Sequence, residues 1–101
     1  MNNPIDEQEV RTLVSQIQSG NTDAEAQLVD LYKRYTASMI RIHRENGYTL
    51  TDEEITSACE SALKRAARKF DLNKDFDFIS YAIWWMREGV VQAKKAKQSS
   101  R

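Results

Sequence analysis

Hydrophobic residues recur along this chain every three to four positions, the spacing that places them on one face of an α-helix. In the first segment the apolar stripe consists of Val10, Leu13, Val14 and Ile17. Asp6 with Glu9 three residues later is typical of a helix start, and Gly20 can adopt the left-handed conformation that ends a helix. The pattern predicts a leading helix within residues 1–19.

A second helical stripe begins at Thr22, where Glu25 completes a capping box, and continues to Ile42. It ends at Asn46 and Gly47, two residue types that favour turns. Nothing between these signals interrupts the helical spacing, so we expect one continuous helix here.

The third stripe has the clearest helix start. Thr51 and Glu54 form a capping box, and the acidic residues 52–54 complement the positive end of the helix dipole. The stripe that follows is rich in alanine, which allows another helix to approach closely. Its members are Ile55, Ala58, Cys59, Ala62, Leu63, Ala66, Ala67 and Phe70.

A polar connection at residues 71–75 leads to the last expected helix, which begins near Asp77 and has a lysine-rich end. Lysines suit the negative end of the helix dipole. No apolar run has the period of two that a half-buried β-strand requires. The chain is therefore predicted to be all-α: a compact bundle of four main helices in one domain over residues 1–101, with a basic tail at 95–101.

Composition narrows the class of protein. Of 101 residues, 41% are hydrophobic and 30% are charged, which is too apolar for a disordered chain and too charged for a membrane protein. The polar N-terminus does not resemble a signal peptide, so we expect a cytoplasmic protein that contacts no membrane. A single cysteine excludes an internal disulfide, and one cysteine with one histidine is too few ligands for an ordinary structural zinc site. We expect neither a metal nor a cofactor.

Residues suited to catalysis are scarce. Cys59 lies on the apolar stripe of the third segment and is expected to be a buried structural thiol. His43 has no motif around it and is expected at the surface or at the boundary of the core. The chain has no Gly-rich phosphate-binding loop and no nucleophile motif. We therefore do not expect an enzyme.

Charge is divided unevenly along a chain whose net charge is zero. Residues 1–60 carry five basic and eleven acidic side chains, whereas residues 61–101 carry ten basic and four acidic ones. Such a chain can offer an acidic face to one partner and a basic face to a polyanion. Ordinary charge variation between helices is the alternative explanation.

Six of the nine aromatic residues fall within residues 69–87. Successive helical residues are about 100° apart, so at least one ring of this last helix should be partly exposed. The candidate rings are Phe78, Tyr81, Trp84 and Trp85, and the neighbouring cations are Lys69, Lys74 and Arg87. Exposed rings beside cations suit single-stranded nucleic acid, because bases stack on rings while cations bind phosphates. A core filled by bulky rings is the alternative.

Region 2 of the sigma-70-type bacterial sigma factors has a signature that resembles a run in this chain: Lys69-Phe70-Asp71, then Asp77-Phe78, then Tyr81-Ala82-Ile83-Trp84-Trp85-Met86-Arg87. The Tyr-Ala-x-Trp-Trp-x-Arg portion is specific to the family, and a looser match extends over residues 20–94. The resemblance implies a sigma region 2-like fold and a role in transcription initiation. It also implies two partners, the RNA polymerase core and single-stranded promoter DNA.

By this resemblance, the last helix would melt the promoter and read its −10 element. Tyr81 would stack on the flipped adenine of the non-template strand. Trp84 and Trp85 would wedge at the upstream fork of the bubble. Phe76 and Phe78 would line the pocket for the melted bases.

The resemblance also implies roles for polar residues. Lys74 and Arg87 would hold backbone phosphates. Glu88 and Val91 occupy the positions at which the family reads the duplex end of the −10 element with Gln and Thr. The third expected helix would dock on the polymerase clamp through Glu54, Ser57 and Glu60.

Departures from the family pattern leave a second hypothesis open. Asp75 and Asp77 flank Phe76 where the family has Gly and Lys, and Glu88 repels phosphates. These residues favour an interaction module that binds polymerase or a regulator without reading DNA. Under the first hypothesis a second subunit would supply recognition of the −35 element, because the chain has no room for the helix-turn-helix domain that reads it. The capped leading helix near Met1 favours a natural start over an excised domain.

Overall fold

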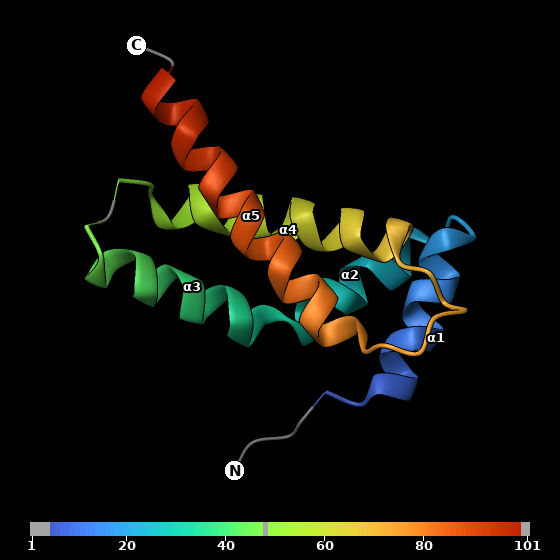
Figure 1. Cartoon of the computed structure of the whole chain (residues 1–101). Coiled ribbons are helices and arrows are strands. Elements are labelled where there is room, and N and C mark those ends of the chain that lie inside the picture. Colours follow the sequence, from blue (N-terminus) through green and yellow to red (C-terminus); the bar gives the residue numbers. More distant parts are fainter. Residues whose placement is uncertain (1–4, 48, 100–101) are drawn as a thin grey trace.

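The computed structural model describes residues 5–47 and 49–99, and within them it contains helices and no strand. The five helices are α1 (Glu7–Gln18), α2 (Thr22–Leu31), α3 (Lys33–Glu45), α4 (Asp52–Lys69) and α5 (Phe78–Ser99). In Figure 1, α5 crosses in front of α4, and α1 and α2 lie at the end of the molecule opposite the α3–α4 turn. The prediction of an all-α bundle is confirmed, with five helices among the described residues in place of the four main ones expected.

The additional helix arises from a break at Tyr32, inside the segment expected to form one helix. The backbone of Tyr32 leaves the helical region with φ −97° and ψ 9°. Its ring is fully buried and packs edge-on against Phe78, with the ring centroids 6.1 Å apart. This bend allows α2 to pack against α1 while α3 packs against α4 (Figure 1). A buried tertiary contact thus overrides a locally continuous helical pattern.

Side-chain caps define several of the helix ends. The Thr51 hydroxyl accepts a hydrogen bond from Glu54 N, and Glu54 accepts one from Thr51 N, so the predicted capping box of α4 is present. Asp6 caps α1 as expected, whereas α2 is capped by Asn21, one residue before the predicted start. Gly20 has a φ of +96°, in the left-handed region expected at the end of α1.

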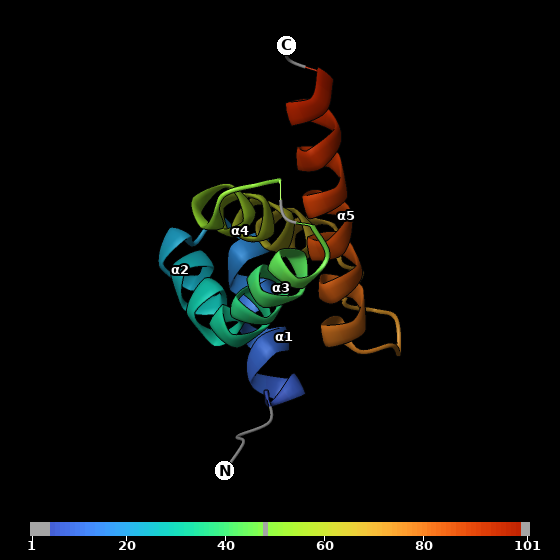
Figure 2. The same ribbon diagram turned by 90° about the vertical axis from the view of Figure 1, so that its left-hand side faces the viewer.

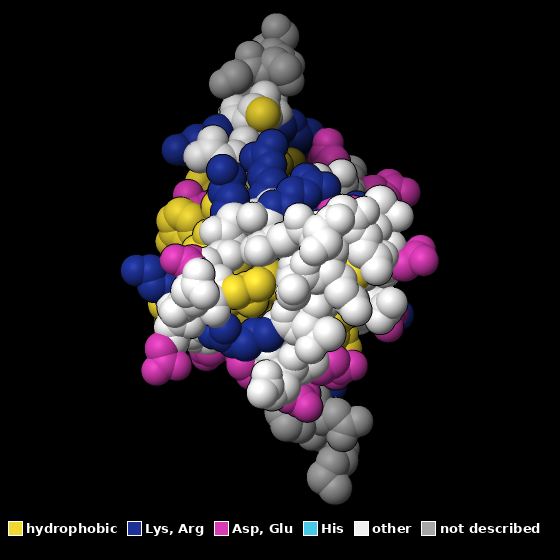
Figure 3. Space-filling view, turned by 90° about the vertical axis from the view of Figure 1, so that its right-hand side faces the viewer, with side chains coloured by type: hydrophobic (Ala, Val, Ile, Leu, Met, Phe, Trp, Pro, Cys, Tyr) yellow, Lys and Arg dark blue, Asp and Glu magenta, His cyan; other side chains and the backbone are white. Residues whose placement is uncertain are grey.

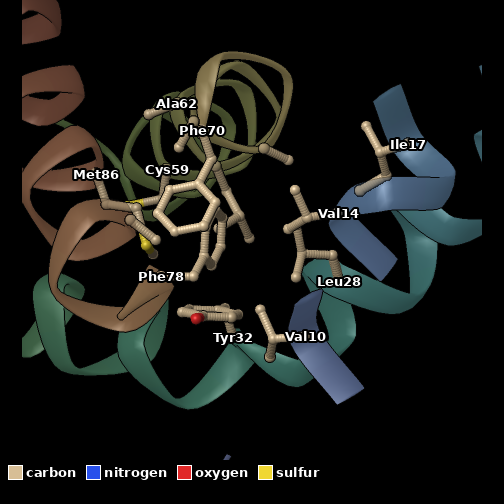
Figure 4. Packing of buried hydrophobic residues seen from close by; sticks show 14 of the residues in the cluster. Val10, Val14, Ile17, Leu28, Tyr32, Cys59, Ala62, Phe70, Phe78 and Met86 are labelled. Carbon is tan, nitrogen blue, oxygen red and sulfur yellow. The ribbon is translucent and has the colours of Figure 1, made fainter. Parts of the chain in front are cut away.

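The core lies where α1, α4 and α5 meet the break at Tyr32. Figure 4 shows the Phe70, Phe78 and Tyr32 rings gathered at its centre, with Val10 and Val14 of α1 packed beside them. Each of these five residues is at most 3% exposed. Their close packing fixes the start of α5 relative to α1, which matters for the candidate site described below.

Cys59 is buried, as predicted. Its side chain has no exposed surface, and its sulfur lies 3.6 Å from the sulfur of Met39. Burial raises the pKa of the Cys59 thiol to about 11. The thiol therefore stays protonated near neutral pH and behaves as a small hydrophobic side chain.

The crossing of α4 and α5 depends on a glycine. A Cβ added at Gly89 would lie 3.0 Å from the carbonyl oxygen of Ala58 and 3.1 Å from the Cβ of Ala62. Both neighbours belong to the alanine-rich stripe of α4, so the close approach expected from that stripe is observed. Gly89 permits the two helix backbones to come this near to each other.

Replacing Gly89 with valine should separate these helices and lower the free energy of unfolding by about 1–3 kcal/mol. Urea titration followed by far-ultraviolet circular dichroism measures this loss. Gln92→Val is the matched control, because it places the same branched side chain at an exposed position of α5. Equal stability of the two variants would contradict the proposed close packing.

His43 is more buried than expected, with 9% of its surface exposed. Its Nε2 accepts hydrogen bonds from Thr49 N at 3.1 Å and from Leu50 N at 3.2 Å. These bonds satisfy two amides that would otherwise be left without a partner beneath the turn before α4. The side chain therefore fixes the entry to α4.

Replacing His43 with phenylalanine keeps a ring but removes this acceptor. We expect the free energy of unfolding to fall by about 1–3 kcal/mol, because the Thr49 and Leu50 amides lose their acceptor. Chemical denaturation measures the effect. His43→Gln retains a side-chain acceptor and should cost less than His43→Phe, and the reverse order would count against this role.

No helix in the described part of the chain is long and apolar enough to cross a membrane. The last turns of α5 extend beyond the other helices, as Figures 1 and 2 show from two directions. This projecting end carries exposed Lys95 and Lys97, and Lys97 Nζ donates hydrogen bonds to Thr49 O and Glu54 Oε1.

Candidate nucleic-acid interface

Four rings form a continuous aromatic surface at the start of α5 and on the segment before it. We define this aromatic surface as Phe76, Tyr81, Trp84 and Trp85. Ring centroids are 6.2 Å apart between Phe76 and Tyr81 and 6.2 Å apart between Tyr81 and Trp85. Trp84 meets Trp85 edge-on at 6.1 Å. Trp84 is 59% exposed and Phe76 is 46% exposed, whereas the other two rings are half-buried.

The helical period of α5 explains this arrangement. Phe78, Ala82 and Met86 repeat every four residues and are fully buried against the core. Trp84 lies on the opposite side of the helix, where solvent is. The expectation that at least one ring of this helix would be exposed is therefore confirmed.

Phe78 does not belong to the aromatic surface, which corrects the role expected for it. It has no exposed surface and packs edge-on against Tyr32 and Phe70, with ring centroids 6.1 and 5.1 Å away. A base cannot stack on a ring that is enclosed on every side. As the first residue of α5, Phe78 shares the inward-facing row of that helix, so its side chain enters the core.

Phe70 packs against the aromatic surface from the core side. Its buried ring lies 5.3 Å from the Phe76 ring and 5.3 Å from the Tyr81 ring. The sequence pattern placed Phe70 on the apolar stripe of α4 but gave no sign that it would carry the neighbouring rings. Contacts of this kind depend on how the chain folds back after α4.

The expected phosphate-binding cations come from two different parts of the chain. Lys74 is exposed in the segment before α5, close in sequence to Phe76. Arg87 is exposed too, but it lies beside Val91 in a groove of about 410 Å³ between α3 and α5. This α3–α5 groove is lined by Met39, Ile42, His43, Asn46, Arg87, Val90, Val91 and Lys94. The structure therefore brings Phe76, Tyr81, Trp84 and Trp85 together, while Arg87 and Val91 share a neighbouring groove.

The remaining expected DNA contact, Glu88, is half-buried on α5. It follows Trp84 by one helical turn, so its carboxylate contributes negative charge near the aromatic surface. Asp75 and Asp77, which flank Phe76, are both exposed. The rings are thus accompanied by acidic as well as basic side chains.

The last turns of α4 carry a basic cluster that sequence reasoning recognised only in part. Its members are Lys64, Arg65, Arg68 and Lys69, and all but Lys64 are exposed. Arg68 also forms an ion pair with Glu25 at 2.6 Å. Figure 3 shows lysine and arginine side chains gathered on the face seen from the α1 side, above exposed hydrophobic side chains. The signal that could have identified the whole cluster is its spacing, because such positions share one side of a helix.

The residues expected to contact polymerase are divided between two hollows on either side of α4. Glu54 and Ser57 are exposed and line a groove of about 850 Å³ between the start of α4 and the end of α5. Glu60 is half-buried and lines a smaller hollow of about 370 Å³ beside α2 and α3. The structure therefore brings Glu54 and Ser57 together and places Glu60 on another side of the helix.

Glu54 already has partners within the chain. Its Oε1 accepts hydrogen bonds from Thr51 N at 2.8 Å and from Lys97 Nζ at 2.9 Å. The Thr51 amide, followed by the Lys97 ammonium, holds the pKa of Glu54 below its usual value. The carboxylate therefore contributes stability above its unfolded-state pKa, and this contribution is lost as pH falls through the lowered pKa. Any partner that binds Glu54 must compete with these contacts.

The residues described here include no cluster of three His, Cys, Asp or Glu side chains that could hold a metal ion. The chemistry that the interface offers is that of stacking rings and charged side chains.

No protein-family model matches the chain. Curated proteins do match it: it is 30% identical over 81 residues to the RNA polymerase sigma factor SigA of Listeria monocytogenes, a match that covers 80% of this chain. The SigA proteins of Listeria innocua and of a Bacillus species match at the same identity over the same length. This chain carries a sigma-70-type region. The match covers 21% of each of these relatives, so the chain spans about a fifth of their length.

Within this sigma-70-type region, the resemblance first drawn from the Tyr81–Arg87 run is confirmed. Trp84, the most exposed ring among the described residues, lies inside that run. The family resemblance and the exposure of Trp84 thus indicate the same part of α5.

Proposed function

We propose that this chain acts in transcription initiation, binding the RNA polymerase core and holding the melted −10 segment of a promoter on its aromatic surface. The single observation that carries the proposal is the exposure of Trp84, 59% of whose surface faces solvent within a chain of ring contacts. A contiguous patch of exposed apolar rings is typical of a binding surface, and Trp84 belongs to such a patch. The similarity to SigA proteins supports transcription initiation as its setting.

The aromatic surface suits unpaired bases better than duplex DNA. Bases in a duplex are stacked on each other, whereas a melted strand offers its base faces to protein rings. Stacking contributes about 1–3 kcal/mol per base and accepts any base, because every base has a π-face. In this proposal Trp84 and Phe76 receive bases directly, and Tyr81 and Trp85 extend the platform between them.

Cations around the aromatic surface would bind the phosphates of the same strand. Lys74 precedes Phe76, and exposed Lys69 is the last residue of α4, directly before the segment that carries Phe76. Their positive charge offsets the repulsion from Asp75 and Asp77. We assign phosphate binding to Lys74, the basic cluster of α4 and Arg87, which lies one helical turn after Trp84 on α5.

Polymerase would bind the other end of α4. The first half of this helix is acidic and exposes Glu53 and Ser57 beside the groove between the start of α4 and the end of α5, whereas its second half carries the basic cluster. Opposite charges at the two ends allow a basic partner and a polyanion to bind at once without competing. In this proposal a second subunit supplies recognition of the −35 element.

The test uses core polymerase and a fork-junction DNA whose −10 segment is single-stranded. We expect the protein to produce a slower-migrating ternary complex, and we expect the fully paired duplex of the same sequence to give a weaker one. Tyr81→Ala combined with Trp84→Ala should weaken the complex with the fork. Failure to form a complex at low salt, or an unchanged complex with the double variant, would refute the proposal.

The acidic side chains around Phe76 favour a second candidate function, an interaction module that binds polymerase or a regulator without holding DNA. Asp75 and Asp77 are exposed on either side of that ring and repel phosphates. This alternative predicts a binary complex with polymerase that does not respond to substitutions in the aromatic surface. A ternary complex on the fork that survives competitor duplex would exclude it.

A further inference from the structure

Helix α1 reaches across the molecule to the segment that carries Phe76. We name residues 70–77, between α4 and α5, the α4–α5 connection. Three polar side chains of α1 hydrogen-bond to backbone atoms in or next to it: Glu7, Arg11 and Gln18. They come from a segment more than 45 positions away in the sequence, so these contacts are purely tertiary.

Arg11 makes the most extensive of these contacts. Its Nη1 donates to the carbonyl oxygen of Leu72 at 3.1 Å, and its Nη2 donates to those of Lys74 at 3.2 Å and Phe76 at 2.9 Å. The guanidinium also lies 5.4 Å from the centroid of the Phe70 ring. One planar group with several donors thus fixes alternate carbonyls of the connection and rests on the ring that supports the aromatic surface.

Glu7 fixes the point where the connection becomes α5. Its Oε2 accepts a hydrogen bond from Phe78 N at 2.9 Å and one from Arg11 Nε at 3.2 Å. The first turn of α5 contains no acidic residue, so a carboxylate from another helix supplies the negative charge that its positive end favours. Arg11 and Glu7 therefore act as a linked pair across the same connection.

Gln18 holds the other end of the α4–α5 connection, where α4 ends. Its Nε2 donates to the carbonyl oxygens of Ala67 at 2.9 Å and Phe70 at 2.8 Å, where α4 ends. These carbonyls have no partner within the helix, because the residues that would donate to them lie outside it. One face of α1 thus holds the end of α4, the connection and the start of α5.

We propose that α1 is a positioning element for the aromatic surface, in which Arg11, oriented by Glu7, holds the α4–α5 connection so that Phe76 meets Tyr81 before DNA binds. The proposal rests on the proposed function for its benefit to DNA binding. An irregular segment that is already ordered loses less conformational entropy when a ligand binds it. Arg11 is a positioning residue here, since Phe76 touches the DNA and Arg11 acts through it.

Glu7 carries a further sign of such a role. Its Oε1 is buried and has no hydrogen-bond partner among the described residues. A buried carboxylate oxygen without a partner lowers stability, whereas the other oxygen of Glu7 accepts two hydrogen bonds, from Phe78 N and Arg11 Nε. One oxygen of Glu7 thus lowers stability, while the other orders the α4–α5 connection. Such a local loss of stability is expected at a position that is kept for a binding site.

The first test needs no DNA. In nuclear magnetic resonance spectra of the full chain, Arg11→Gln should remove the nuclear Overhauser contact between the Phe76 and Tyr81 rings and increase amide exchange at Phe78. Arg11→Lys keeps the charge but lacks the planar fork, so it should show most of the same loss. Arg34→Gln, on α3, removes one positive charge elsewhere and should leave the ring contact intact. Persistence of the ring contact in both Arg11 variants would overturn the proposal.

The second test measures DNA affinity in the ternary complex with core polymerase and the fork-junction DNA. Phe76→Ala should weaken binding about tenfold, as expected for one lost stacking contact. Arg11→Gln should weaken it about three- to tenfold in the wild-type background but have almost no effect in the Phe76→Ala background. A general structural role would give equal losses in both backgrounds and would overturn the proposal.

The two tests separate this inference from the proposed function. Absence of DNA binding by the wild-type protein would refute the proposed function, while the ring contact and amide exchange would still decide whether α1 orders the connection. Loss of the ring contact in Arg11→Lys as well as Arg11→Gln supports the geometric role. Loss of the ring contact in Arg11→Gln alone would show that a positive charge is enough to hold the connection, and it would overturn the geometric role.

Discussion

Replacing Phe78 with alanine should lower the free energy of unfolding by about 3–5 kcal/mol, the largest stability effect we expect from a single substitution in this chain. Phe78 has no exposed surface and contacts the rings of Tyr32, Phe70 and Tyr81. Its removal leaves a cavity beneath the start of α5 that these large rings cannot fill without moving. Because a domain of this size has a total stability of only about 5–15 kcal/mol, much of the population could unfold at moderate temperature.

Urea unfolding and thermal melting measure this loss. Trp84→Ala is the matched control, because it removes a larger ring from the exposed side of the same helix and should change stability by less than about 1 kcal/mol. Phe78→Leu refills part of the cavity and should fall between the two. If Phe78→Ala left stability unchanged while it weakened DNA binding, Phe78 would belong to the binding surface after all.

The double variant Phe76→Ala with Trp84→Ala should lose melted-DNA binding by at least about 30-fold, the largest binding effect we expect. Each ring offers about half of its surface to solvent, so each can receive a base without rearrangement of the core. Two lost stacking contacts amount to about 2–6 kcal/mol. Titration of labelled fork-junction DNA into the complex with core polymerase measures the loss.

Ile42→Ala is the control for this double variant. Ile42 is also exposed, at 49%, but it belongs to the α3–α5 groove and not to the aromatic surface. Its removal should leave the affinity for melted DNA almost unchanged, and both variants should still bind polymerase. A comparable loss for Ile42→Ala would show that DNA occupies the groove as well, and no loss for the double variant would exclude the aromatic surface.

Local patterns in the sequence predicted most of the helical framework. The capping box at Thr51 and Glu54 and the turn at Gly20 appear in the structure where they were expected. Helical spacing alone predicted that the Cys59 thiol is buried and that a ring on the last helix is exposed. These features depend on residues within a few positions of each other, which is the range over which a helix imposes its period.

What the sequence did not predict depends on contacts between distant segments. The break at Tyr32 follows from its packing against Phe78, and the burial of Phe78 follows from the same contact. The contact of Arg11 with the carbonyl oxygen of Leu72 joins residues 61 positions apart. Local periodicity contains no information about which side chain will satisfy a carbonyl in a remote turn.

The sequence predicted the members of the candidate site, but not how they group in space. Phe78, expected to line the pocket for the melted bases, lies in the core, and Arg87 and Val91 line a groove with residues of α3 that the linear motif did not indicate. Which helix flanks a given stretch of α5 is decided by the fold of the whole chain.

The burial of Cys59 makes this protein well suited to site-specific labelling. It is the only cysteine in the chain, it has no exposed surface, and its thiol pKa of about 11 leaves almost no thiolate near neutral pH. A cysteine introduced at exposed Ser57 would therefore react with a maleimide dye or a crosslinker far faster than the native thiol. Attached there, a probe would report directly on whether the first half of α4 touches polymerase.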